Sequence, residues 1–235
     1  MTAATNYGID AGLAADLACA SLALARRFSA GGTMWSMSPS WAPHALHIAV
    51  EFIHPVVVGK RALPAVALSG PDLVDVARVS VSAGDIVVAV ANADDPQVGS
   101  VMRRAPAWGA TTIWMGSGPR PPVGAADHVL WLDNPDPRAT VTGGFVLLYH
   151  LLWELTHVCF EHPGLLMANE CADDVCVTCS DEGRLGEVVS KSARGSALVR
   201  TSQGPQTVST ELVGPVAAGD LVLVHAGMAI SKLDA

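Results

Sequence analysis

Residues 84–91 read Gly-Asp-Ile-Val-Val-Ala-Val-Ala, and Asp95-Pro96 follow them closely. The run is of strand length, rich in β-branched residues and continuously apolar, which is typical of a strand buried on both faces of a parallel sheet. Aspartate suits a helix N-cap and proline suits the first helical position, so we expect a helix from Asp95 towards Trp108. This stretch therefore predicts one strand–helix unit of an α/β domain.

The same alternation extends on both sides of that unit. Short apolar runs of strand length alternate with longer segments of helical pattern, and this order predicts a parallel sheet covered by helices on both faces. We assign residues 1–162 to this α/β domain. The expected helices are Ile9–Phe28, Pro43–His54 and Thr140–Phe160, and the further apolar or strand-like runs are Ala65–Ser69, Ala110–Met115 and His128–Leu132.

The pattern changes after a polar linker, residues 163–175, which begins with Pro163-Gly164. Beyond it no helical period is found, and short β-prone runs are separated by turn residues, which predicts a small β-barrel over residues 176–235. The runs are Arg184–Ser190, Ala197–Thr201, Thr207–Leu212 and Leu221–His225.

Composition excludes several function classes. The formal net charge is -8, whereas a domain that binds nucleic acid through its phosphates is normally basic. The apolar run Leu13–Ala25 contains Asp16, and its arginines follow it, which is the wrong order for a signal peptide; it is also too short to span a membrane. We therefore expect a cytoplasmic protein that binds neither nucleic acid nor membrane. The odd count of five cysteines agrees with a reducing compartment.

The end of the chain carries the most specific motif. Residues 219–234 read Gly-Asp-Leu-Val-Leu-Val-His-Ala-Gly-Met-Ala-Ile-Ser-Lys-Leu-Asp and resemble the carboxyl end of the HypC/HupF hydrogenase maturation chaperones. The resemblance implies an OB-like barrel without enzymatic activity or a permanent cofactor. It implies binding to a HypD-like scaffold protein, and delivery of an iron that carries cyanide and carbonyl ligands to the large-subunit precursor of a nickel-iron hydrogenase.

The family's leading cysteine and its barrel histidine map onto Cys176 and His225. Thiolate suits a soft low-spin iron, and imidazole can ligate the metal or steer protons. Two departures from the family are evident: the thiol lies in mid-chain, and the proline that normally follows it is missing, so Cys179 remains an alternative. A rival hypothesis takes Cys171, Cys176 and Cys179 as a permanent metal site, but no further cysteine follows to complete an iron–sulfur set.

Residues 1–162 resemble an SIS (sugar isomerase) domain of the phosphoheptose isomerase type. The matching segments are Gly31–Met34, His47–Phe52, Leu63–Ser69 and Gly84–Val88. The resemblance implies a flavodoxin-like fold and a homodimer. The apolar character of the first and last helices also favours a dimer.

Two features oppose isomerase activity. In place of the family's hydroxyl-rich phosphate loop, this chain has Asp94-Asp95-Pro96, where two carboxylates would repel a phosphate and proline removes an N–H donor. The histidine expected on the last helix is replaced by Phe145, although His150 lies on that helix. Glu51 matches a catalytic carboxylate, but aldose–ketose chemistry needs both an acid and a base. We expect Glu51 and His150, like His44, His47 and His54, to be structural.

We therefore predict a non-enzymatic hydrogenase maturation chaperone in which the SIS-like domain serves docking or dimerisation. The alternatives are a sugar-phosphate isomerase or a sugar-sensing SIS protein, with the barrel as an accessory.

Overall fold

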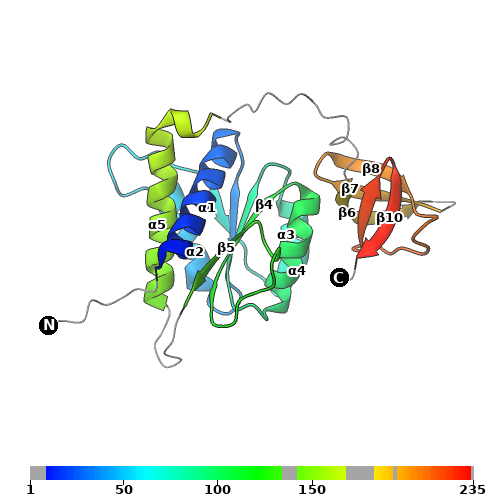
Figure 1. The fold of residues 1–235 in the computed structure, drawn as a ribbon, viewed down its shortest axis with the longest axis horizontal. Helices are drawn as coiled ribbons and strands as arrows, with labels where there is room; N and C mark the ends of the chain where they lie inside the picture. Colours follow the sequence, from blue (N-terminus) through cyan, green and yellow to red (C-terminus); the bar gives the residue numbers. More distant parts are fainter. Residues whose placement is uncertain (1–8, 134–141, 168–182, 193–194, 234–235) are drawn as a thin grey trace.

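The computed structural model describes residues 9–133, 142–167, 183–192 and 195–233. They form an α/β unit, in which helices cover a central sheet, and a β-barrel that lies beside it (Figure 1). The predicted fold class, a parallel flavodoxin-like domain followed by an OB-like barrel, is confirmed.

The central sheet has five parallel strands in the order β2-β1-β3-β4-β5. This is the doubly wound order in which ligands bind outside the carboxyl ends of the strands. The strands are β1 (Met34–Met37), β2 (Ala65–Ala67), β3 (Ile86–Val90), β4 (Thr111–Ser117) and β5 (His128–Leu132).

Two helical layers cover the sheet. Helices α1 (Ala11–Ser29), α2 (Ala42–Ile53) and α5 (Thr142–Glu161) lie on one face (Figure 1). The other face is covered by α3 (Leu73–Ser80), α4 (Pro96–Arg104) and the 3-10 helix η1 (Ala105–Trp108).

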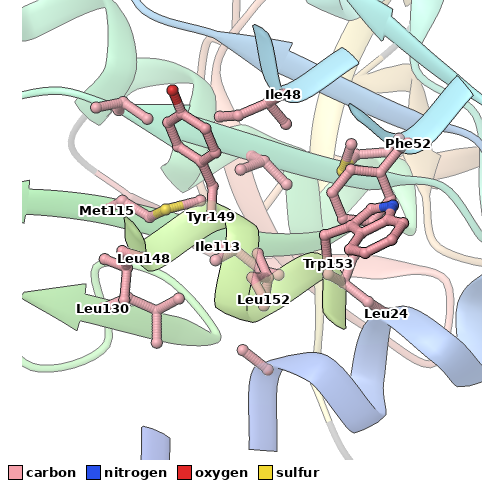
Figure 2. Packing of buried hydrophobic residues seen from close by; sticks show 14 of the residues in the cluster. Leu24, Ile48, Phe52, Ile113, Met115, Leu130, Leu148, Tyr149, Leu152 and Trp153 are labelled. Carbon is pink, nitrogen blue, oxygen red and sulfur yellow. The ribbon is translucent and has the colours of Figure 1, made fainter. Parts of the chain in front are cut away.

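Successive residues of β3 belong to different apolar cores. Ile86 and Val88 pack under α1, α2 and α5, whereas Val87 and Ala89 pack under α3 and α4. The burial of β3 on both faces explains why its sequence is continuously apolar. Figure 2 shows the first core, where side chains of α5 meet the strands and α2.

The predicted start of α4 is confirmed. Asp95 is the N-cap, and its Oδ1 accepts hydrogen bonds from the backbone N–H groups of Gln97 at 3.1 Å and Val98 at 3.0 Å. Two elements of the α/β unit were not predicted. Strand β1 is only four residues long and includes a buried serine, and α3 is a helix of only eight residues.

The barrel closes in the order β10-β8-β7-β6-β9, with β9 also paired to β10. Strands β8 and β10, the third and fifth of the barrel in chain order, pair in parallel, and the other strand pairs are antiparallel. This is the arrangement of an OB-like barrel. The strands are β6 (Arg184–Ser192), β7 (Ser196–Thr201), β8 (Gly204–Ser209), β9 (Leu221–His225) and β10 (Met228–Leu233).

Strand β10 was not among the predicted strands, since of its side chains only Ala229 is buried. The run expected at Thr207–Leu212 begins earlier, at Gly204, and ends at Ser209. Within the proposed linker, the described part forms the short 3-10 helix η2 (Pro163–Leu165).

Glu187 of β6 connects the barrel to the α/β unit. It is only 2% exposed, and Trp108 Nε1 donates a hydrogen bond of 2.6 Å to its Oε2. Arg78 Nε donates to its Oε1 at 3.1 Å, and Arg104 Nε lies 3.3 Å from the same oxygen. Leu221 completes the apolar cluster beneath α3 and α4. The two units therefore share a buried, charged and apolar interface.

Helix α5 is the one helix in the described residues that is long and apolar enough to cross a membrane by length and composition. Core helices pass the same test, and Tyr149, Leu152 and Trp153 of α5 are buried in the first core (Figure 2).

Candidate functional site

The cysteines proposed as functional, Cys176 and Cys179, lie outside the described residues, as does Cys171. The remaining cysteines, Cys19 and Cys159, are free thiols of the α/β unit, on α1 and α5.

His225 is the last residue of β9 and is partly exposed. The two-residue turn that follows it has positive φ at both positions, 47° at Ala226 and 77° at Gly227. Such a turn matches the twist of a β-hairpin, but alanine adopts this conformation with strain. The turn thus holds His225 at the rim of the barrel, where β9 passes into β10.

A second group of candidate site residues lies in the α/β unit. His47 and Glu51 are one helical turn apart on α2, and His150 approaches them from α5. His47 Nε2 lies 3.1 Å from Glu51 Oε1 and 3.2 Å from His150 Nε2, and His150 Nε2 lies 3.4 Å from Glu51 Oε1. All three residues are partly exposed, so a ligand from solvent can reach the cluster.

Tyr149 orients this cluster from the core side. Its hydroxyl lies 2.9 Å from His47 Nδ1. Burial, together with the charge of Glu51, raises the pKa of Tyr149 to about 12, so the hydroxyl keeps its proton near neutral pH. The tautomer of His47 sets the direction of this hydrogen bond: a ring protonated on Nδ1 donates to Tyr149 and leaves Nε2 free to ligate a metal, whereas a ring protonated on Nε2 accepts from Tyr149 and points its proton towards Glu51.

The cluster is a candidate metal site. One ligand atom from each of His47, Glu51 and His150 lies within 4.8 Å of the others. Two imidazoles and one carboxylate with an open fourth position are a common ligand set for catalytic zinc. Alternatively, without metal the same groups supply both a base and an acid.

The prediction treated these residues as separate structural positions, and the structure brings three of them together. The i,i+4 spacing of His47 and Glu51 was visible in the sequence, because such residues share one face of a helix. His150 is far away along the chain, and only the packing of α5 against α2 places it beside them.

A pocket of about 230 Å³ lies at the carboxyl ends of β1 and β3. Its lining includes Ser38, Ser40, His44, Asn92 and Phe145. Burial, with a smaller contribution from the charge of His47, lowers the pKa of His44, so this ring faces the pocket mostly neutral. The pocket therefore offers hydroxyls, an amide and neutral rings.

The start of α4 is unsuited to phosphate. In many α/β folds free N–H groups at such a helix start receive a phosphate. Here Asp95 accepts hydrogen bonds from two of these N–H groups, and Pro96 has no N–H.

Phe145 of α5 is buried, and its ring packs edge-on against the ring of His44, with 5.4 Å between the ring centroids.

Comparisons with known proteins found matches for both the barrel and the α/β unit. Residues 183–235 match the model of the HupF/HypC family. The α/β unit is similar to a phosphoheptose isomerase from Francisella tularensis, with 16% identity and a TM-score of 0.53, over 63% of this chain and 86% of the isomerase. A phosphoheptose isomerase from Neisseria gonorrhoeae is similar at 16% identity and a TM-score of 0.50, over 64% of this chain and 87% of that one. No curated protein matches the chain.

The chain is thus an SIS-like α/β domain joined to a small closed barrel. The match to the HupF/HypC family model is confined to the barrel segment, residues 183–235. At 16% identity, the similarity to the isomerases shows the fold of the α/β unit and not its activity. The family match begins at residue 183, after Cys176 and Cys179.

Proposed function

We propose that this protein is a cytoplasmic, non-enzymatic hydrogenase maturation chaperone. Its barrel helps to assemble the iron-cyanide-carbonyl centre with a HypD-like scaffold protein and delivers it to the large-subunit precursor of a nickel-iron hydrogenase. The iron is cargo, and the chaperone keeps no permanent cofactor. The observation that carries the proposal is the HupF/HypC match over residues 183–235, whose described part contains all five strands of the closed barrel.

In this proposal Cys176 is the thiolate that holds the iron, with Cys179 as the alternative, and His225 assists at the barrel rim. A thiolate is an anionic, polarizable ligand that suits low-spin iron, whereas a serine hydroxyl stays protonated near neutral pH. His225 ends β9 beside a strained turn, and strained backbone is often found at functional sites.

The SIS-like domain then serves docking and dimerisation. Helix α2 exposes a row of apolar side chains, since Leu46 is 57% exposed and Val50 is 52% exposed, and Trp41 at the start of the helix is 53% exposed. Covering such a row is favourable, and a second copy of the chain would cover it. A light-scattering mass of one chain, 24.3 kDa, would contradict the dimer.

The decisive experiment measures hydrogenase activity in cells together with the iron content of the complex that co-purifies with the protein. Cys176→Ser is expected to abolish both, whereas Cys179→Ser should reduce them less. Cys19→Ser is the matched control, because Cys19 is an exposed free thiol on α1. Wild-type activity and iron content in both Cys176→Ser and Cys179→Ser would refute the thiol mechanism.

A second candidate function rests on the cluster of His47, Glu51 and His150. A metal held there, with Tyr149 behind His47, suits proton transfer on a hydroxylated substrate such as a sugar. The blocked start of α4 disfavours a phosphorylated substrate. Calorimetric titration with zinc tests this alternative: binding that is lost in Glu51→Gln and retained in Glu154→Gln, an exposed position on α5, would support it.

A further inference from the structure

A pocket of about 350 Å³ lies between the barrel and the α/β unit. It is lined by Arg78 of α3, by Glu187 and Arg200 of the barrel, and by Gly219 in the loop before β9. At the edge of the pocket, a bulge in β6 between Val188 and Ser190 interrupts the pairing of β6 with β7. Ligand pockets are common at domain interfaces, and bulges are common beside binding sites.

Positive charge is in excess around this pocket. The guanidinium groups of Arg78 and Arg104 form ion pairs with the buried carboxylate of Glu187, and Arg200 pairs with Glu187 in the strand register and interacts with its charge. The other carboxylate in contact is Asp75, whose side chain is 65% exposed and pairs with Arg78 from the solvent side. Burial lowers the pKa of Arg78, but the hydrogen bonds and charges of Glu187 and Asp75 outweigh burial and raise it, so the excess positive charge lies on Arg104 and Arg200.

The guanidinium of Arg104 shows the imbalance directly. Its Nε is close enough to Glu187 for an ion pair but is not aligned for a hydrogen bond, and its Nη1 is buried without a hydrogen-bond partner among the described residues. Its Nη2 donates to the carbonyl oxygen of Gly219 at 3.2 Å, and Gly219 lines the pocket. A buried cation that lacks full compensation is costly, and Arg104, which does not line the pocket itself, adds positive charge beside the lining residue Gly219.

Arg200 supplies hydrogen-bond donors at the pocket. Its Nη1 and Nη2 donate to the backbone oxygens of Arg78 at 2.8 Å and Val81 at 2.6 Å, next to the end of α3. These bonds use two of the five N–H groups that a guanidinium carries. Burial lowers the pKa of Arg200, Glu187 partly offsets this, and the like charge of Arg78 adds to it. The charge of an anion beside Arg200 would therefore offset the cost of burying this guanidinium and its repulsion from Arg78.

We infer that this pocket binds a small oxyanion, a phosphate or a carboxylate group, held between Arg78 and Arg200. Planar guanidinium groups bind both kinds of oxyanion through paired hydrogen bonds. Because the two arginines come from different units, the bound anion connects the barrel to the SIS-like domain. Its concentration then sets how firmly the barrel is docked, which is a property separate from iron handling.

The test uses the full chain and two probes, inorganic phosphate and succinate. Calorimetric titration measures the affinity of each probe, and thermal unfolding at constant ionic strength measures its effect on the melting temperature. A ligand that binds only the folded state raises the melting temperature with its concentration. We expect a saturable rise with phosphate, with succinate, or with both, that sodium chloride does not reproduce; the tighter binder identifies the kind of oxyanion.

Arg78→Lys keeps the positive charge beside Glu187 but loses the planar pair of donors, so we expect affinity to fall by about tenfold while the fold is retained. Arg200→Gln should abolish binding. Arg103→Lys, at an exposed position on α4, is the matched control and should bind like the wild type. The inference is overturned if neither probe exceeds the effect of chloride, or if Arg78→Lys binds both probes as tightly as the wild type.

Discussion

Replacing Glu187 with glutamine tests whether the buried carboxylate fastens the barrel to the α/β unit. Glutamine keeps the volume and an oxygen that can accept from Trp108, but it removes the charge that faces Arg78 and Arg104. Breaking a buried ion pair costs about 3–5 kcal/mol. We take the lower end, about 3 kcal/mol, because Arg78 is partly exposed and solvent screens its share.

The loss is measurable by heat and by urea. In a chain of this length each kcal/mol shifts the melting temperature by ~2–4 °C, so Glu187→Gln should lower it by ~6–12 °C. Tryptophan fluorescence follows unfolding in urea, and X-ray scattering reports whether the barrel separates, through an increased radius of gyration. Glu211→Gln is the control, since Glu211 is an exposed barrel residue. Equal transition midpoints for both variants and the wild type would refute the conclusion that Glu187 fastens the barrel to the α/β unit.

Three further predictions concern the barrel turn, the sheet and pH. Ala226→Gly should raise the unfolding free energy of the barrel by about 0.5–1 kcal/mol in urea titration, because glycine adopts the positive φ of this turn without strain; a lower stability would contradict the strain. Gly116→Ala should lower the free energy of unfolding by about 1–3 kcal/mol or more in the same urea titration. A Cβ at this position would collide with the Trp131 ring and lie 2.5 Å from the carbonyl oxygen of Ala91. An unchanged free energy of unfolding would show that the strand can move aside. The pKa of His44 is lower in the folded state than its ordinary value of 6.5, so the unfolded chain binds the proton more readily and stability should fall as pH drops below 6.5. We would measure the melting temperatures of the wild type and of His44→Gln between about pH 7.5 and about pH 5, a range that brackets the ordinary histidine pKa. The melting temperature of His44→Gln should depend less on pH than that of the wild type. An identical pH dependence would exclude His44 as the source of the effect.

The candidate sites differ in how far the sequence could predict them. The barrel motif is recognisable because its residues are consecutive, so the motif alone places His225 at the end of a strand. The cluster in the α/β unit was missed, because His150 is separated from His47 and Glu51 by most of the sheet and reaches them only when α5 packs on the same face as α2. The anion pocket was missed for the same reason, since Arg78 and Arg200 come from different units.

The sequence by itself determined the local structure and the class of each unit. Continuous apolar runs specify strands buried on both faces, Asp95-Pro96 specifies a helix start, and the turn-rich end of the chain specifies a barrel, because each depends on neighbouring residues. The tertiary structure alone decided how the units meet. Glu187 looks like an ordinary polar residue of a strand in the sequence, and it becomes the centre of the interface only when Trp108 and the arginines of α3 and α4 surround it. Burial turns its charge into a strong interaction, and burial is a property of the assembled fold.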